Sequence, residues 1–213
     1  IALNYSSRNG DGIAGVGWGL AAGGAISRCS ATYAQDGFAK GVSYSATTDR
    51  LCYNGQRLIT FSGSYGANGT KYKTEIDSFA VITQLGGSIN DAGTYFEVTL
   101  PNGHEERFGH TNESKVIHTG VSQTHTWLID KKNDYANKNH ISYQYQDIGD
   151  GEVLLSTILY TGDGNNDGDR KVTFEYEDKG YTRSSYLAGG KSFSSKRLKK
   201  ITTYYKTSKV RSY

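Results

Sequence analysis

The sequence predicts an all-β protein, with a predominantly antiparallel multi-stranded sheet or sandwich and short hairpins. Three observations support this prediction. Tyr accounts for 17 of the 213 residues, and Tyr suits half-buried strands because its ring packs on a pleated surface while its hydroxyl stays in water. The 27 Gly against one Pro indicate many tight turns and bulges. Between these turns the hydrophobic pattern has period two, as in strands that bury one face.

The first half of the chain begins with an alternating stretch at residues 1–6, which ends in the turn Arg8-Asn9-Gly10-Asp11-Gly12. The dipeptide Asn54-Gly55 is a strong hairpin signal and precedes a short strand at 56–61. Two further strands are expected at 72–76 and 79–84.

The clearest hairpin joins strands at 95–100 and 104–108 through Pro101-Asn102-Gly103. Pro presets φ at one corner of such a turn and Gly accepts a positive φ at another. The remaining strands are separated by polar loops and are expected at 126–129, 140–145, 153–160, 171–176, 196–205 and from 209 onward. Short strands with short connections are typical of a sandwich, a barrel or an extended sheet.

Almost no helix is expected, and no long one, because the only helix-permissive stretch, residues 16–26, contains four Gly, each costing about 1 kcal/mol relative to Ala. The preceding Gly10-Asp11-Gly12-Ile13-Ala14-Gly15 matches a dinucleotide-binding fingerprint. That fingerprint needs a helix to start there, since the helix amino terminus holds the pyrophosphate. We therefore interpret Gly15 and Gly17 as structural residues that let the backbone turn tightly around Trp18, whose ring we expect to anchor the core.

Charge and hydropathy exclude several classes of protein. Lys and Arg number 24 and Asp and Glu 21, a net charge of +3 that is too small to indicate nucleic-acid binding. The basic residues at 191–211 alternate with apolar ones, as on a solvated strand face. No apolar stretch has the length of a membrane span. The chain starts with Ile, lacks Met and has no signal peptide, so we expect one continuous β unit over residues 1–213, cut from a longer chain.

Cys29 and Cys52 are the only cysteines. Three interpretations are open: a disulfide, two buried thiols, or a nucleophile. The even count and the extracellular type of composition favour the disulfide.

The best metal candidate is the loop Asp163-Gly164-Asn165-Asn166-Asp167-Gly168-Asp169. Asp163, Asn165, Asp167 and Asp169 occupy the positions of the first half of a calcium loop, with Gly at the sixth. The bidentate ligand expected at position 12 is missing, because Phe174 stands there. A solvated turn explains the same residues, so we expect no cofactor and keep calcium as the alternative.

The sequence offers no catalytic constellation. The five His residues fall on unrelated strands without the spacing of a zinc motif. The adjacent Glu105 and Glu106 would point to opposite faces of a strand, and no GxSxG element is present. We therefore expect no enzyme activity.

Several segments, in order, resemble one known family along nearly the whole chain. They are Leu3 to Gly12, Gly15 to Leu20, Ile26 to Arg28, Asp49 to Leu58, Tyr72 to Phe79, Trp127 to Asp130, Val172 to Glu177, Tyr186 to Gly190 and Lys196 to Ile201. These are similar to the "YSS-x-x-GNG-x-x-G-x-GW-x-L" opening and the "V-x-F-x-YE … RL-x-x-I" close of the amino-terminal domain of SpvB and toxin-complex B-component proteins. Asp11 replaces the Asn of the usual Gly-Asn-Gly.

The resemblance implies a structural role in a secreted bacterial protein. In that family this domain precedes propeller repeats and RHS/YD repeats, which together build a β-sheet shell around a toxic carboxy-terminal segment, and catalytic chemistry lies in other domains. The expected function is thus a non-catalytic shell module whose partners are neighbouring propeller and RHS/YD-repeat domains. The alternative is an extracellular carbohydrate-binding or adhesive domain that uses exposed Tyr and Trp.

Overall fold

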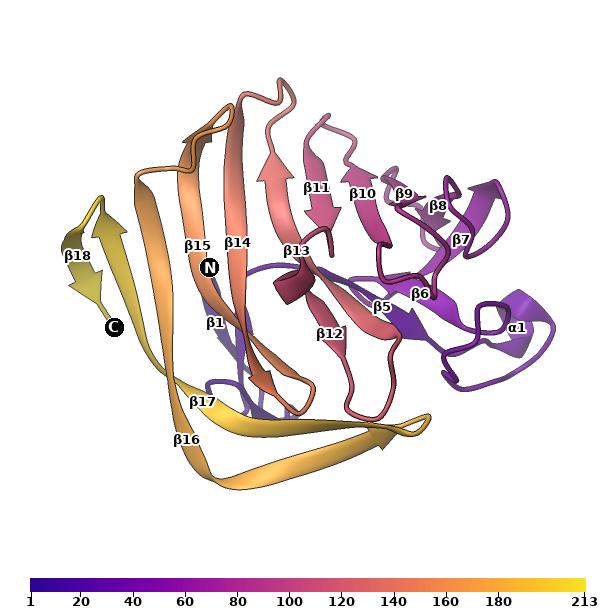
Figure 1. Ribbon diagram of the computed structural model, residues 1–213, viewed down its shortest axis with the longest axis horizontal. Helices are drawn as coiled ribbons and strands as arrows, with labels where there is room; N and C mark the ends of the chain where they lie inside the picture. Colours follow the sequence, from indigo (N-terminus) through magenta and orange to yellow (C-terminus); the bar gives the residue numbers. More distant parts are fainter.

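The computed structural model, which describes all 213 residues, contains a closed antiparallel barrel of eight strands (Figure 1). These strands are β5 (Ala25–Cys29), β6 (Arg50–Tyr53), β7 (Gln56–Ser62), β8 (Lys71–Thr74), β9 (Val81–Leu85), β10 (Tyr95–Thr99), β11 (Glu105–Phe108) and β13 (Thr124–Asn133). The barrel closes on β13, because Thr126–Leu128 pair with β5 while residues 129–133 pair with β11.

The barrel interior holds the main hydrophobic core. Alternate residues point inward, and the fully buried side chains include Tyr72, Phe96, Phe108 and Trp127. The Trp127 indole is 0% exposed and donates a hydrogen bond to the Thr94 carbonyl at 3.0 Å. Burying so many aromatic rings in one barrel provides its main stabilisation, since each fully buried large side chain is worth about 1.5–3 kcal/mol.

An open sheet continues from the same strand β13 (Figure 1). It consists of β14 (Asn139–Gly149), β15 (Glu152–Asp163), β16 (Arg170–Leu187), β17 (Gly190–Tyr205) and β18 (Ser208–Ser212). The short β12 (Lys115–Ile117) pairs with the start of β13. The β16–β17 hairpin is far longer than the expected strands and changes register between Asp178 and Arg183, so that its tip reaches below the β12–β13 connection in Figure 1.

The first 24 residues form a strap that lies against one face of the open sheet. Its strands are β1 (Ala2–Tyr5), β2 (Asp11–Gly12), β3 (Gly15–Val16) and β4 (Trp18–Ala21), paired β1 with β4 and β2 with β3. Leu20 and Ala22 of the strap pack on a second, smaller core formed by Ile158, Val172 and Phe174.

The prediction that Trp18 anchors the core is wrong. Trp18 is 42% exposed and contacts Tyr5 in a tilted arrangement, with ring centroids 5.2 Å apart, within the β1–β4 pair. The glycines beside it do adopt conformations that other residues avoid, since φ is +114° at Gly15 and +80° at Gly17. A Cβ on Gly17 would lie 2.6 Å from the Tyr5 ring, so the glycine permits the ring to pack on the backbone.

The predicted disulfide is present and joins Cys29 on β5 to Cys52 on β6, with the two Cα atoms 6.0 Å apart. Helix is confined to α1 (Tyr33–Asp36) and the 3-10 turn η1 (Asn112–Ser114). Neither has the length and apolar composition to cross a membrane. The all-β prediction is confirmed.

Candidate functional site

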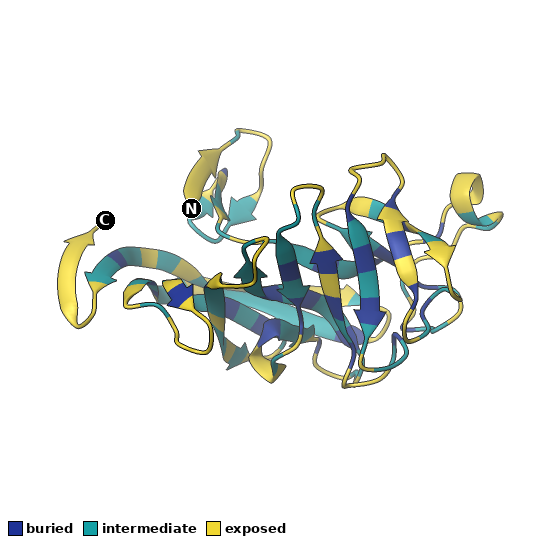
Figure 2. Ribbon diagram, turned by 90° about the horizontal axis from the view of Figure 1, so that it is seen from above, coloured by how far each residue is buried: buried dark blue, intermediate teal, exposed yellow.

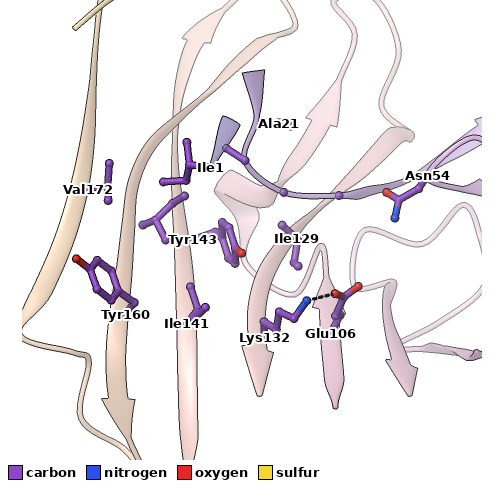
Figure 3. A pocket seen from close by; sticks show the side chains of 14 residues that line it. Ile1, Ala21, Asn54, Glu106, Ile129, Lys132, Ile141, Tyr143, Tyr160 and Val172 are labelled. Atoms are coloured by element: carbon purple, nitrogen blue, oxygen red, sulfur yellow. Dashed lines mark hydrogen bonds and ion pairs between the residues drawn. The ribbon is translucent and has the colours of Figure 1, made fainter. Parts of the chain in front are cut away.

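The candidate site lies on the inner face of the open sheet, which is the face that the strap covers in part. Residues 21–24 of the strap cross this face, and an apolar groove runs on each side of them. Figure 3 shows the first groove, a cavity of ≈ 590 Å³. Its lining is mainly apolar: Ile1, Ala21, Ala22, Gly23, Gly24, Asn54, Glu106, Ile129, Lys132, Ile141, Tyr143, Ile158, Tyr160 and Val172. The second groove, of ≈ 450 Å³, lies between the strap and residues that include Leu128, Tyr145, Leu155 and Tyr176.

The strap can cross close to the neighbouring strands because the residues at the crossing, Gly23 and Gly24, have no side chains. A Cβ on Gly23 would lie 2.9 Å from the Ile129 side chain, and one on Gly24 would lie 2.7 Å from the Asn54 amide. The Gly24 carbonyl accepts a hydrogen bond from the Ile129 N–H at 3.1 Å. The strap is thereby tied to the strand shared by the barrel and the open sheet.

Polar groups stand at one end of the first groove. The Lys132 ammonium lies 2.7 Å from the Glu106 carboxylate, and the Tyr53 hydroxyl donates to the same carboxylate at 2.8 Å (Figure 3 shows the ion pair). Burial and the bond to Glu106 raise the pKa of Tyr53, so the phenol stays protonated. With its acceptors occupied, Glu106 is a structural carboxylate, and the groove offers apolar contact rather than a nucleophile and base.

The Gly10–Gly15 segment does not start a helix; it forms the β2–β3 hairpin of the strap. Asp11 in this hairpin pairs with Lys179 of β16 at 2.9 Å, and the two side chains are only 9% and 2% exposed. The hydrogen bond from Lys179 lowers the pKa of Asp11. The Ile13 carbonyl also accepts a hydrogen bond from Leu198 on β17 at 2.7 Å. This motif therefore docks the strap on the bend of the long hairpin.

The sheet ends in a free edge at β18, whose five residues are all exposed (Figure 2). Val210 in its centre is 67% exposed, between the cationic Lys209 and Arg211. An exposed strand edge presents unpaired backbone donors and acceptors and can pair with another strand.

The calcium candidates lie on the β15–β16 connection, where they bond to nearby protein groups. Asp167 accepts a hydrogen bond from Ser142 at 3.2 Å and Asp169 accepts one from Thr161 at 3.1 Å, while Asp163 pairs through its backbone with Asn166. No three His, Cys, Asp or Glu side chains converge there or elsewhere. The absence of a tight calcium site stays a prediction, which a calcium titration followed by thermal unfolding would test.

The structure brings together two histidines that sequence reasoning had placed on unrelated elements. His118, just after β12, stacks on His125 of β13 with ring centroids 4.6 Å apart. The Tyr44 hydroxyl lies 2.9 Å from His118 Nδ1. A β12–β13 hairpin prediction would have placed the two residues near one another, but Tyr44 comes from a distant loop that has no sequence signal.

Comparison with known proteins supports one family. The family model described as SpvB, Salmonella virulence plasmid 65kDa B protein, matches residues 1–171. No curated protein matches the chain.

Among solved structures, the N-terminal domain of effector protein SpvB from Salmonella typhimurium strain LT2 is similar with a TM-score of 0.75 and 18% identity, over 95% of this chain and 81% of that one. TcdB2-TccC3-Cdc42 is similar with a TM-score of 0.74 and 14% identity, over 95% of this chain and 12% of that one. The Photorhabdus luminescens Tc holotoxin pore is similar with a TM-score of 0.74 and 17% identity, over 95% of this chain and 12% of that one. The TM-scores show a shared fold, and this chain spans about an eighth of the toxin chains.

Proposed function

We propose, from the premise that this chain belongs to the SpvB family, that it is a non-catalytic structural module of a secreted bacterial toxin-complex-like protein. In this proposal the module contributes to a β-sheet shell that encloses or delivers a toxic carboxy-terminal segment. Its partners are neighbouring propeller and RHS/YD-repeat domains of the same polypeptide or complex. The 1–213 unit folds as one body within that assembly.

The observation that carries the proposal is the contrast between the two parts of the sheet. The barrel has no unpaired edge strand, because it closes on β13. The open sheet, in contrast, ends in the exposed strand β18. The inner face of the open sheet keeps two apolar grooves beside the strap. An open edge and a half-covered apolar face favour packing against further protein.

Size-exclusion chromatography of the isolated chain, and of the chain joined to its neighbouring domains, tests the proposal. We expect the isolated chain to associate and the longer protein to be monodisperse, with the amides of residues 199–213 protected from exchange only in the longer protein. The variant Val210→Lys places a charge on the free edge and should suppress association of the isolated chain. Tyr33→Lys is the matched control, because Tyr33 is 74% exposed on α1 of the barrel against 67% for Val210.

A carbohydrate-binding or adhesive module is the second candidate, favoured by the exposed Tyr181, Tyr186, Tyr205 and Tyr213 near the hairpin and the carboxy-terminal strand. Three of these rings, those of Tyr186, Tyr205 and Tyr213, lie against Lys or Arg side chains. A stable monomer that binds a specific glycan on an array, with no effect of the neighbouring domains, would reject the shell module and support this alternative.

A further inference from the structure

The tip of the β16–β17 hairpin is fastened to the barrel side of the molecule at one place. Thr119, after β12, and Lys191, at the start of β17, exchange two backbone hydrogen bonds of 2.8 Å each. The contact is tight, because a Cβ on Gly190 would lie 2.8 Å from the Cβ of His118. His118 is therefore wedged directly under the hairpin tip.

The histidine pair His118 and His125 supports this contact from the barrel side. Their rings lie within 20° of parallel, a stacking geometry that suits two neutral rings. The Tyr44 hydroxyl bonds His118 Nδ1 at 2.9 Å, and Thr126 Oγ1 lies 2.7 Å from His125 Nδ1. Tyr44 also reaches the hairpin, since its hydroxyl is 3.2 Å from where a Gly190 Cβ would be.

The barrel side offers no free counter-charge to a protonated ring. Arg28 on β5 is fully buried close by, with its guanidinium 5.4 Å from the centre of the Tyr44 ring. The Asp49 carboxylate already forms an ion pair with the Arg28 guanidinium at 2.9 Å. An added positive charge on His125 would thus face a buried cation and lose its hydration.

On the hairpin side, the Glu152 carboxylate is likewise occupied by other hydrogen-bond donors. His118 lines a cavity of ≈ 250 Å³ together with Glu152 of β15. The Glu152 carboxylate already accepts hydrogen bonds from the Ser195 N–H at 3.0 Å, the Ser195 hydroxyl at 2.6 Å and the Lys196 N–H at 3.2 Å. The Lys191 ammonium, 4.2 Å from the centre of the Phe193 ring, is a further cation on this side.

We propose that the stacked pair His118 and His125 is an acid-sensitive latch that holds the β16–β17 hairpin tip on the barrel while both rings are neutral and releases it on protonation. A neutral pair stacks and accepts the Tyr44 bond, whereas an imidazolium is repelled by its neighbour and by Arg28. Opening of the latch breaks the two backbone hydrogen bonds between Thr119 and Lys191 and exposes both imidazole rings to water.

The direction of the pH dependence follows from the burial of the rings. Burial, then the neighbouring His118 and Arg28, lowers the pKa of His125 to about 4, and burial lowers the pKa of His118. When the latch is open, the ring is solvated and its pKa returns to about 6.5. The latch is therefore fully closed above pH 6.5 and weakens as the pH falls toward 4. Protonation of His125 alone raises the opening constant about 20-fold between pH 7 and pH 5.

NMR amide exchange on the whole chain tests the latch, expressed as protection factors so that the intrinsic effect of pH on exchange is removed. We expect the protection factors of Thr119 and Lys191 to fall about 20-fold or more from pH 7 to pH 5, while those of Ile82 and Val98 in the barrel stay constant. His125→Asn keeps a polar group beside Thr126 but cannot titrate, and should reduce the fall to the smaller part that His118 contributes. His104→Asn, on the β10–β11 turn, is the matched control and should leave it intact.

A second variant covers the case in which His125→Asn disturbs the fold. Tyr44→Phe removes the hydroxyl bond to His118 and should lower the protection of Thr119 and Lys191 at pH 7, with the barrel amides unchanged. The latch is refuted if wild-type protection at Thr119 and Lys191 is the same at both pH values. It is equally refuted if the barrel amides lose as much protection as the tip, or if His125→Asn retains the full wild-type fall.

Discussion

Replacing Asp49 by Asn should destabilise the barrel more than any change to a surface charge. Asp49 and Arg28 form an ion pair of 2.9 Å in which both side chains are 0% exposed. The Arg28 guanidinium also donates to the carbonyls of Thr124 and Ile89, each at 2.7 Å, and to the Asn90 side chain at 2.8 Å. One arginine therefore joins two loops and the start of β13 at one end of the barrel.

The magnitude follows from what the variant leaves behind. Asp49→Asn keeps the volume but removes the only carboxylate paired with the buried guanidinium, and breaking a buried pair in this way costs about 3–5 kcal/mol. In a protein of this size 1 kcal/mol corresponds to about 2–4 °C, so Tm should fall by about 6–20 °C. Urea denaturation should show the same loss as a lower midpoint at unchanged slope.

Two companion variants distinguish this cause from a general disturbance. Glu177→Gln breaks an exposed pair with Arg197 and should cost about 0–1 kcal/mol. Arg28→Met combined with Asp49→Asn removes both charges and should be less destabilising than the sum of the two single variants. An Asp49→Asn protein within 1 °C of the wild-type Tm would show that the buried guanidinium needs no partner, and the reasoning would fail.

Three further outcomes are expected. Reducing the Cys29–Cys52 disulfide, or replacing both cysteines by Ser, should lower the free energy of unfolding by about 3 kcal/mol, which urea denaturation with and without reductant would measure. Gly17→Ala should detach β1 from β4, because the added Cβ meets a tyrosine ring at 2.6 Å where φ is +80°; faster proteolysis confined to the strap would report it. Lys179→Met should loosen the strap in the same assay, because it leaves the Asp11 carboxylate with only the exposed Arg183, at 4.0 Å, as a charged partner, whereas Lys196→Met, in a pair with side chains 29% and 80% exposed, should have no effect.

Local signals in the sequence were sufficient for the turns and the strands next to them. Asn54 and Gly55 both adopt positive φ, +48° and +82°, as the hairpin dipeptide predicts between β6 and β7. Gly103 has φ of +78° in the turn after Pro101. These conformations depend on the residues themselves, so one sequence is enough to predict them.

The closure of the barrel could not be predicted, because it depends on a change of partners along one strand. β13 pairs with β5 through Thr126–Leu128 and with β11 and β14 further along, and no local pattern encodes such a switch. The two Trp residues illustrate the same limit. Each lies in a short apolar stretch, but only Trp127 falls inside the closed ladder, while Trp18 lies in the strap.

The architecture gives the two parts of the molecule different sources of stability. The barrel pairs its own edges and carries the disulfide and the large aromatic core, so its stability is internal. The open sheet has only three buried apolar residues in its core, and it is held by long-range contacts at Gly24, between Asp11 and Lys179, and between Thr119 and Lys191. Segments with small cores and few fastenings open at lower free energy than the rest of a protein. The open sheet should therefore be the part that changes first when a partner binds or the pH falls, with the barrel as the fixed support.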